Sequence, residues 1–157
     1  TEEFENLVVS RTFSKAYGLA GLRVGYMIAN KEITSILNRL RAPFNVNIVA
    51  LAAAVAALDD TEFLKKTVDN NTTERNRYAS FCKEHDLFMI PSKANFVAVD
   101  FKGYDAQVIA DKLLHQGIIV RPLLGYKLQD ILRISIGRPE ENDRLFNALD
   151  KILKESK

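Results

Sequence analysis

The chain has 157 residues, which is enough for one ordinary domain or two small ones and for a sizeable buried core. Hydrophobic residues make up 47% and charged residues 27%, and 22 lysines and arginines nearly balance 20 aspartates and glutamates, which argues against a nucleic-acid binder or a polybasic membrane binder. The single cysteine, Cys82, excludes an internal disulfide and suits a reducing cytoplasm, and the longest apolar run, residues 48–58, is about half the ~20 residues of a membrane span.

The first predicted element is a short buried strand at residues 7–9, and the segment that follows it, residues 10–26, carries the densest chemistry in the chain. Its hydroxyl, amine and guanidinium groups belong to Ser10, Thr12, Ser14, Lys15 and Arg23. Glycines around the arginine permit close backbone approach and positive φ. Hydroxyls, backbone N–H groups and a guanidinium fork are the donors that bind a dianionic phosphate, so the segment predicts a phosphate site with the Lys15 amine beside it.

An amine beside a phosphate site suits a cofactor that is both an aldehyde and a phosphate ester, and pyridoxal phosphate has this chemistry. An equally supported interpretation is that Lys15 is a solvated lysine and Arg23 a structural ion-pair partner, and residue types alone do not decide between the two. Thr12 and Lys15 also have the spacing of a Ser-x-x-Lys acyl hydrolase. That interpretation is disfavoured, because the nucleophile would be a threonine and the sequence has no SDN or KTG partner motif.

The next predicted elements are a strand and three helices. We expect a strand at residues 24–29, a cap at Asn30 and an amphipathic helix that ends before Pro43. Residues 46–58 are apolar nearly all round, which predicts a helix enclosed either in a core or at a subunit interface. A long polar helix then runs to about His85, and its length and polarity are typical of a helix that bridges two domains.

The remaining residues predict a compact α+β unit. Strands are expected at residues 87–90, 95–101, 118–120 (buried) and 131–136. One helix is capped by Asp105 and closed by Gly117, and a last helix begins near Pro139. The apolar residues of these helices are Ile109, Ala110, Leu113 and Leu114 in the first, and Leu145, Phe146, Leu149, Ile152 and Leu153 in the second.

Two arginines of this unit are candidate anion ligands. Arg133 alternates with apolar residues in its strand, so it either faces solvent or directs a guanidinium at an anion, and the spacing leaves both open. Arg121 ends the preceding predicted strand. The histidines and the cysteine, at positions 85, 115 and 82, have no metal-ligand spacing, so we expect no metal site.

The segment around Lys15 closely resembles the cofactor-lysine region of fold-type I pyridoxal-phosphate aminotransferases, and among them looks most like the histidinol-phosphate aminotransferases. The shared pattern is formed by Ser14, Lys15, Gly21, Leu22, Arg23, Gly25 and Tyr26. The resemblance implies that Lys15 is the Schiff-base lysine. It assigns the cofactor phosphate to Thr12, Ser14 and Arg23.

The same resemblance extends to the second half of the chain. Residues 132–137 resemble the aminotransferase motif whose arginine receives the anionic end of the substrate, which implies that Arg133 is a substrate ligand. Arg121 matches a second anion-binding arginine of the histidinol-phosphate group. Asn95 matches a structural asparagine at the start of a strand.

The fold that the resemblance implies is α/β, the C-terminal part of an aspartate-aminotransferase-like protein. Residues 1–70 would be the remainder of the large cofactor-binding domain, and residues 71–157 a small C-terminal α+β domain. The chain opens at Thr1 without an initiator methionine and enters a strand within six residues, so we expect a fragment that is inactive on its own. In the full-length protein we expect a homodimer, with residues 46–58 near the subunit interface.

The implied activity is transamination with pyridoxal 5'-phosphate as cofactor, from histidinol phosphate to 2-oxoglutarate, giving imidazole acetol phosphate and glutamate in histidine biosynthesis. We expect small-molecule partners, no nucleic acid, no membrane and a cytoplasmic location. Alternatives of the same fold are an aromatic amino acid aminotransferase and a threonine-phosphate decarboxylase, which CO₂ release against glutamate formation would separate. An alternative of another class is a non-catalytic oligomerisation module whose apolar helix pairs with a partner.

Overall fold

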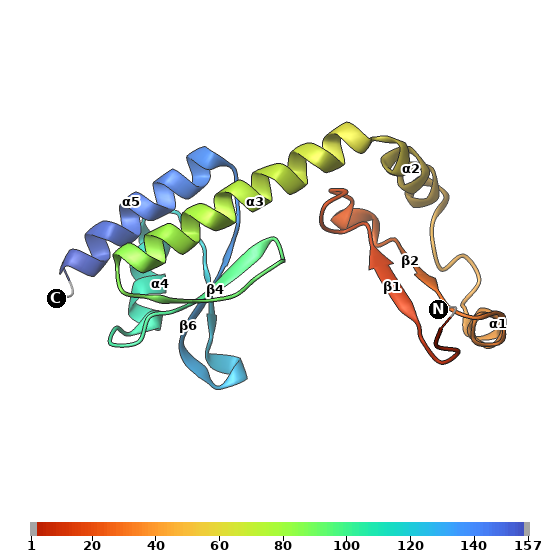
Figure 1. Ribbon diagram of the computed structural model, residues 1–157, viewed down its shortest axis with the longest axis horizontal. Coiled ribbons are helices and arrows are strands. Elements are labelled where there is room, and N and C mark those ends of the chain that lie inside the picture. Colours follow the sequence, from red (N-terminus) through yellow and green to blue (C-terminus); the bar gives the residue numbers. More distant parts are fainter. Residues whose placement is uncertain (1–2, 156–157) are drawn as a thin grey trace. The chain divides into compact units, whose positions relative to one another are not determined.

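A computed structural model describes residues 3–155. The chain divides into two compact units, Thr1–Val68 and Asp69–Lys157. The division falls inside one long helix, α3, which spans Thr61–Glu84 (Figure 1). None of the helices within the described residues is long and apolar enough to cross a membrane.

The first unit is built on a two-stranded antiparallel ladder. Strand β1, Val9–Thr12, pairs with β2, Gly25–Ile28, in a register that runs from Val9 opposite Ile28 to Thr12 opposite Gly25. The connection between the strands contains a short 3₁₀ turn, η1, at Ala20–Leu22. The unit has a small core, formed by the buried side chains of Phe13, Val24, Ala50 and Ala54.

The prediction of a buried strand at residues 7–9 is wrong. The strand begins only at Val9, where pairing with Ile28 begins, and Leu7 and Val8 are 39% and 43% exposed. Apolar composition alone indicated burial there, but more than a third of the surface of each of these two residues is exposed.

Asparagines cap the two helices that follow. In α1, Lys31–Leu40, the Oδ1 of Asn30 accepts a hydrogen bond from the N–H of Ile33, as predicted. In α2, Ile48–Asp59, Asn47 caps in the same way. Only Ala50 and Ala54 of α2 are buried, so the chain itself does not provide the core, and the subunit interface, the other predicted enclosure, stays a prediction. More than half of the surface of five apolar side chains is exposed, on Ile48, Val49, Leu51, Val55 and Leu58.

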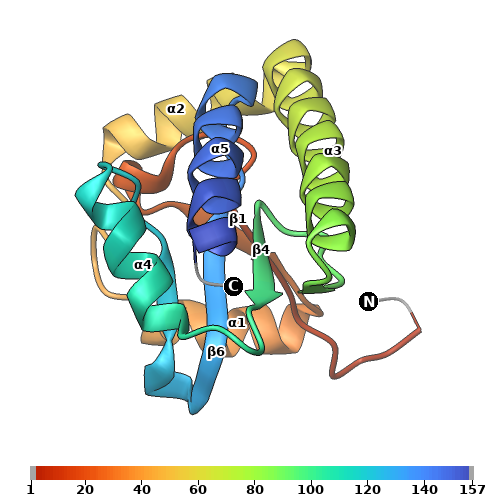
Figure 2. The same ribbon diagram turned by 90° about the vertical axis from the view of Figure 1, so that its left-hand side faces the viewer.

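The second unit is one antiparallel sheet with helices on one face (Figure 2). The strands are β3 at Phe88–Ile90, β4 at Phe96–Asp100, β5 at Arg121–Leu123 and β6 at Leu128–Ser135, in the order β3-β4-β6-β5. A short 3₁₀ turn, η2 at Leu124–Tyr126, joins β5 to β6. The covering helices are α3, α4 at Ala106–His115 and α5 at Pro139–Glu155.

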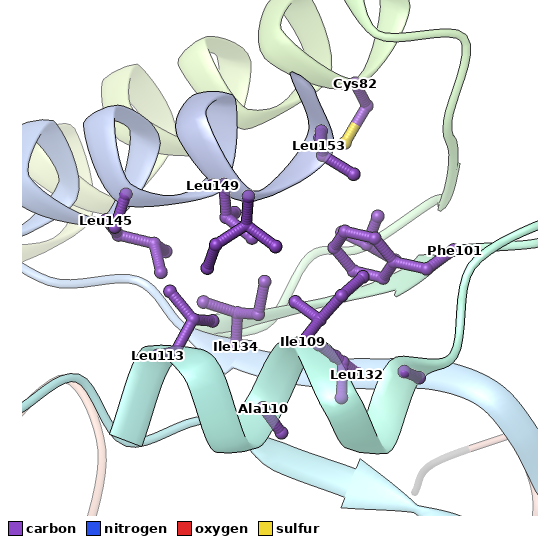
Figure 3. Close-up of a cluster of buried hydrophobic side chains, with 14 of the residues drawn as sticks. Cys82, Phe101, Ile109, Ala110, Leu113, Leu132, Ile134, Leu145, Leu149 and Leu153 are labelled. Atoms are coloured by element: carbon purple, nitrogen blue, oxygen red, sulfur yellow. The ribbon is translucent and has the colours of Figure 1, made fainter. Parts of the chain in front are cut away.

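The core of this unit follows from the period-2 alternation of the central strands. Val97 and Val99 on β4 and Leu132 and Ile134 on β6 point toward the helices and are buried. Figure 3 shows the helix side chains that meet them, among them Cys82, Ile109, Leu113, Leu145, Leu149 and Leu153. Leu114, predicted on the same apolar face of α4, is instead 54% exposed because it lies at the edge of that face.

The predicted strand at residues 118–120 is wrong, and the end of α4 gives the reason. The N–H of Ile118 donates to the carbonyl of Leu113 at 2.9 Å, and the N–H of Gly117 donates to the carbonyl of Leu114 at 2.9 Å. This is a Schellman cap, with Gly117 at φ +73°. The cap uses the N–H of Ile118, the first residue of the predicted strand; Ile119 is 85% exposed, and β5 begins only at Arg121.

We expect Gly117→Ala to lower the free energy of unfolding by about 1 kcal/mol, because a Cβ in the left-handed region is strained. The added Cβ would also lie 3.2 Å from the guanidinium of Arg144. Urea denaturation measures the change. Gly125→Ala is the matched control, since a Cβ there meets no heavy atom within 4 Å and needs no positive φ. An equal loss in both variants would contradict the prediction.

Candidate functional site

The loop between β1 and β2, residues 13–24, holds the predicted cofactor segment. Two backbone hydrogen bonds close it: the N–H of Phe13 donates to the carbonyl of Val24, and the N–H of Leu19 donates to the carbonyl of Phe13. The buried Phe13 ring packs against Tyr17, with ring centroids 5.0 Å apart. Sequence therefore places an aromatic anchor under the loop while its polar residues remain at the surface.

Three of the predicted phosphate ligands lie together on this loop. The N–H of Ser14 donates to the Oγ1 of Thr12 at 3.0 Å, and a guanidinium nitrogen of Arg23 lies 3.5 Å from the Oγ of Ser14. The same nitrogen donates to the carbonyl of Ala20 at 2.8 Å. Arg23 has a left-handed backbone, φ +54°, directly after η1. The turn thus brings the Arg23 side chain back to the hydroxyl of Ser14, nine residues earlier in the chain.

Lys15 follows Ser14 directly and is exposed. Its carbonyl accepts a hydrogen bond from the N–H of Gly18 at 2.9 Å, which closes a tight turn. Among residues 3–155, the Lys15 amine has no hydrogen-bond or ion-pair partner, and Arg23 has no carboxylate partner. The loop is therefore a group of donors without a counter-anion, which suits an anionic ligand.

A tight backbone contact holds β2 against β1 next to this group. A Cβ built on Gly25 would lie 2.6 Å from the carbonyl oxygen of Arg11. No side chain fits at that distance, so glycine is required for the two strands to approach as they do. Gly25 belongs to the Gly-Tyr pair of the predicted cofactor motif, and its role in this structure is to set the strand spacing.

The two candidate substrate arginines lie side by side in the second unit. Arg121 on β5 is the register partner of Arg133 on β6, so their side chains share one face of the sheet. The guanidinium of Arg133 lies 5.3 Å from the ring centroid of Phe96, and that of Arg121 lies 6.0 Å from the ring centroid of Tyr126. Neither arginine has an ion pair with a described residue.

This face of the sheet is the one away from the core, because the neighbours of Arg133 on β6, Leu132 and Ile134, point toward the helices. Arg133 is half-buried and Arg121 exposed. Like charges directly opposite each other destabilise an antiparallel pair. An anion between the two guanidinium groups would remove that repulsion, so the geometry favours the anion-binding interpretation of Arg133.

Sequence analysis missed a buried polar network at the end of β6. The side chains of Glu74 and Asn142 are each only 2% exposed, and the Nδ2 of Asn142 donates to the Oε2 of Glu74 at 2.8 Å. The periodicity contained the signal. Glu74 is four residues before the buried Tyr78, and Asn142 is three residues before the buried Leu145, so both polar residues occupy the apolar faces of their helices.

A second polar contact lies at the N-terminal end of α5, between Arg138 and Glu141. The carboxylate of Glu141 accepts hydrogen bonds from the backbone N–H of Arg138 at 2.8 Å and from its guanidinium at 3.1 Å. These bonds lower the pKa of Glu141 below its ordinary value of 4.5, the backbone bond contributing most.

The stability that Glu141 contributes should therefore depend on pH in one direction. A lowered folded-state pKa means that the contribution is present above the unfolded pKa and is lost as pH falls through the folded value. We expect the difference in unfolding free energy between wild type and Glu141→Gln to be greatest near neutral pH and to shrink below pH 4.5. Denaturation at several pH values measures it. Glu84→Gln, an exposed glutamate outside this turn, should show no such trend; a parallel trend would contradict the assignment.

Comparison with known proteins decides the family. The sequence matches the family described as aminotransferase class I and II over residues 1–149. The chain belongs to this family. Histidinol-phosphate aminotransferase 2 of Haemophilus influenzae strain 86-028NP is 55% identical to this chain over 153 residues. These residues cover 98% of this chain and 42% of that protein.

Solved structures agree with the fold. The histidinol-phosphate aminotransferase of Sinorhizobium meliloti, solved in complex with pyridoxal 5'-phosphate, has a TM-score of 0.85 and 35% identity, over 96% of this chain and 42% of that one. That of Clostridium acetobutylicum has a TM-score of 0.90 and 25% identity, over 98% of this chain and 48% of that one. The predicted family and the α/β aspartate-aminotransferase-like fold are confirmed. This aminotransferase-family chain spans about two fifths of the length of the curated relatives it matches.

Proposed function

We propose that this chain supplies the cofactor lysine and the substrate arginines of a transaminase that converts histidinol phosphate and 2-oxoglutarate to imidazole acetol phosphate and glutamate. The observation that carries the proposal is that Thr12, Ser14 and Arg23 are joined by hydrogen bonds, and that Lys15, which follows Ser14 directly, has an amine without a partner among the described residues. The 55% identity to a histidinol-phosphate aminotransferase supports the choice of substrate.

The residues of the loop fit pyridoxal 5'-phosphate. The donor set of two hydroxyls and a guanidinium matches a phosphate ester, and the unpaired primary amine matches an aldehyde. In this proposal Thr12, Ser14 and Arg23 hold the phosphate, and Lys15 holds the aldehyde carbon through Nζ. When bound, the cofactor supplies an electron sink for the electron pair that remains after a substrate C–H bond is broken.

The chain's own residues then have distinct tasks. The carbonyl of Ala20 fixes the Arg23 guanidinium through the 2.8 Å bond, so the charge that holds the phosphate is oriented before the ligand arrives. The Thr12 hydroxyl, whose oxygen accepts from the Ser14 N–H, keeps its own proton free to donate. Lys15 Nζ takes the proton from the substrate α-carbon as general base and then, as general acid, gives it up at a different carbon from the one it left.

Arg121 and Arg133 hold the anionic end of the substrate in this proposal. Two guanidinium groups on one sheet face can receive the phosphate of histidinol phosphate in one half-reaction and the distal carboxylate of 2-oxoglutarate in the other. Phe96 and Tyr126 lie against the guanidinium groups and limit their motion. The same pair of arginines therefore serves both substrates.

The remaining assignments are part of the proposal. Residues 1–70 would be the remainder of the large cofactor-binding domain and residues 71–157 the small domain, and the division of the chain within α3 supports this. The exposed apolar side chains of α2 support a homodimer that covers them. The free, buried Cys82 is compatible with a reducing cytoplasm.

A chimera tests the proposal. In it, this chain replaces the matching 153 residues of the Haemophilus influenzae relative. We expect glutamate formation from histidinol phosphate and 2-oxoglutarate. Borohydride reduction in the presence of pyridoxal phosphate, followed by peptide mapping, should place the cofactor on Lys15. Modification of another lysine would refute the site, and substrate-dependent CO₂ release without glutamate would instead indicate the decarboxylase alternative.

A further inference from the structure

We infer that Asn142, held in place by α3, is a positioning residue: it keeps the guanidinium of Arg133 where it can bind the anionic end of the substrate. The inference rests on the proposed function, because it assigns Arg133 that task. Asn142 is 2% exposed and lies in the first turns of α5, and its bonds to the chain after β6 are made at Gly137.

Asn142 binds both backbone groups of one residue in the turn after β6. The N–H of Gly137 donates to its Oδ1 at 3.1 Å, and its Nδ2 donates to the carbonyl of Gly137 at 3.1 Å. The same carbonyl accepts a third bond from the Nδ2 of Asn70 on α3, at 3.2 Å. Gly137 is therefore fixed from two helices at once.

The amide of Asn142 is itself fully used. Its Oδ1 also accepts from the hydroxyl of Tyr78 at 2.9 Å, and its Nδ2 also donates to the Oε2 of Glu74 at 2.8 Å. The carboxylate of Glu74 pairs with Arg77 at 2.8 Å, which offsets the cost of burying its charge. An amide with two donors and two accepted bonds has only one orientation that satisfies all partners, so the Asn142 side chain cannot rotate without breaking buried bonds.

Only three residues separate the fixed Gly137 from Arg133, and two of them belong to β6. Ser135 and Arg133 are register partners of Phe96 and Ala98 on β4, and the N–H of Ile136 donates to the carbonyl of Asn95 at 3.0 Å. A slip of one residue in this register would move Arg133 to the core face of the sheet. Fixing Gly137 therefore fixes the register that keeps the guanidinium over Phe96.

Helix α3 also fixes the strand that carries Phe96. The Nδ2 of Asn71 donates to the carbonyl of Ala94 at 3.1 Å, two residues before β4 begins. Neighbouring asparagines on α3, at positions 70 and 71, thus hold the turn after β6 and the turn before β4. Because β4 and β6 are antiparallel, these two turns lie at the same end of the strand pair, so α3 holds both strands at the end where Phe96 is opposite Ser135.

A double-mutant cycle in the chimera tests the inference. We expect Asn142→Ala to raise KM for histidinol phosphate about tenfold while kcat changes less than about twofold, a coupling within the usual range for residues of one network. In the Arg133→Gln background the same change should alter KM less than about twofold. A tenfold rise that persists without Arg133, or no rise in its presence, would overturn the inference.

Matched variants separate positioning from lost stability. Ile109→Val removes a buried methyl group from the same core on α4, outside the network, and should lower the melting temperature without changing KM. Tyr78→Phe removes one of the bonds that orient the Asn142 amide but leaves both bonds to Gly137, so it should raise KM less than Asn142→Ala does. A rise in KM in Ile109→Val, which lies outside the network, would show that general destabilisation explains the effect.

The test still gives an answer if Asn142→Ala does not fold or if Arg133→Gln has no effect. If Asn142→Ala does not fold, Asn70→Ala removes one of the three bonds at Gly137 and should raise KM about threefold, again only when Arg133 is present. An unchanged KM in Asn70→Ala would then overturn the inference. If Arg133→Gln alone leaves KM unchanged, the proposed function of Arg133 is refuted. If Arg133→Gln raises KM but Asn142→Ala raises it equally with and without Arg133, only the inference about Asn142 is refuted.

Discussion

Replacing Lys15 with alanine in the chimera should lower kcat for transamination by a factor of about 10² to 10⁴, because the variant loses the amine that moves the proton at the substrate α-carbon. The structure leaves this amine without a partner among the described residues, so the substitution breaks no contact of the fold. The rate of glutamate formation measures the loss, and thermal unfolding should be unchanged. Borohydride reduction should no longer attach the cofactor at position 15.

Two variants show whether the amine or merely the charge matters. Lys15→Arg keeps the positive charge but cannot give up its proton at neutral pH, so it should lose as much activity as the alanine variant. Lys66→Ala removes an exposed lysine of α3 in the same unit and should retain full activity. Transamination that survives in Lys15→Ala would contradict the assignment of Lys15 as the amine that moves the proton.

Replacing Arg133 with glutamine should raise KM for histidinol phosphate about 10- to 100-fold, which corresponds to the loss of a charge-assisted hydrogen bond to the phosphate. The effect should depend on the ligand's charge. A substrate analogue without the phosphate should bind the variant and the parent enzyme equally well. Steady-state kinetics with both substrates measure the ratio.

The position of the charge, and not the net charge of the unit, should decide this result. Lys102→Gln removes one positive charge from the turn after β4 and should leave KM unchanged. Arg121→Gln should raise KM as well, since Arg121 is opposite Arg133 in the β5–β6 pair. Equal KM values in the parent and Arg133→Gln would assign Arg133 to the solvent-facing interpretation that its spacing also allowed.

Local chemistry explains what sequence analysis predicted correctly. Asn30 and Asp105 cap their helices as predicted, because a side-chain oxygen bonds to N–H groups only two or three residues away. The family was likewise identified from one short segment around Lys15, and the match over residues 1–149 confirms it. The roles of the individual site residues stay predictions.

Two apolar segments show what the local sequence pattern does not specify. The apolar residues 118–120 were predicted as a strand, but the backbone after Gly117 is committed to the Schellman cap. The apolar residues of α2 predicted enclosure in a core or at a subunit interface, and within the chain itself only Ala50 and Ala54 are buried. Hydrophobicity states that a side chain favours burial; it does not state which element covers it.

The sequence by itself determined the helices, their caps and the hydroxyl–amine–guanidinium segment around Lys15, because those depend on residues close together in the chain. Only the tertiary structure decided that Arg121 stands opposite Arg133 and that Asn142 binds Gly137 together with Glu74, 68 residues away. Strand register and buried hydrogen bonds of this kind join distant segments. They form only when the whole unit packs, so no local pattern in the sequence specifies them.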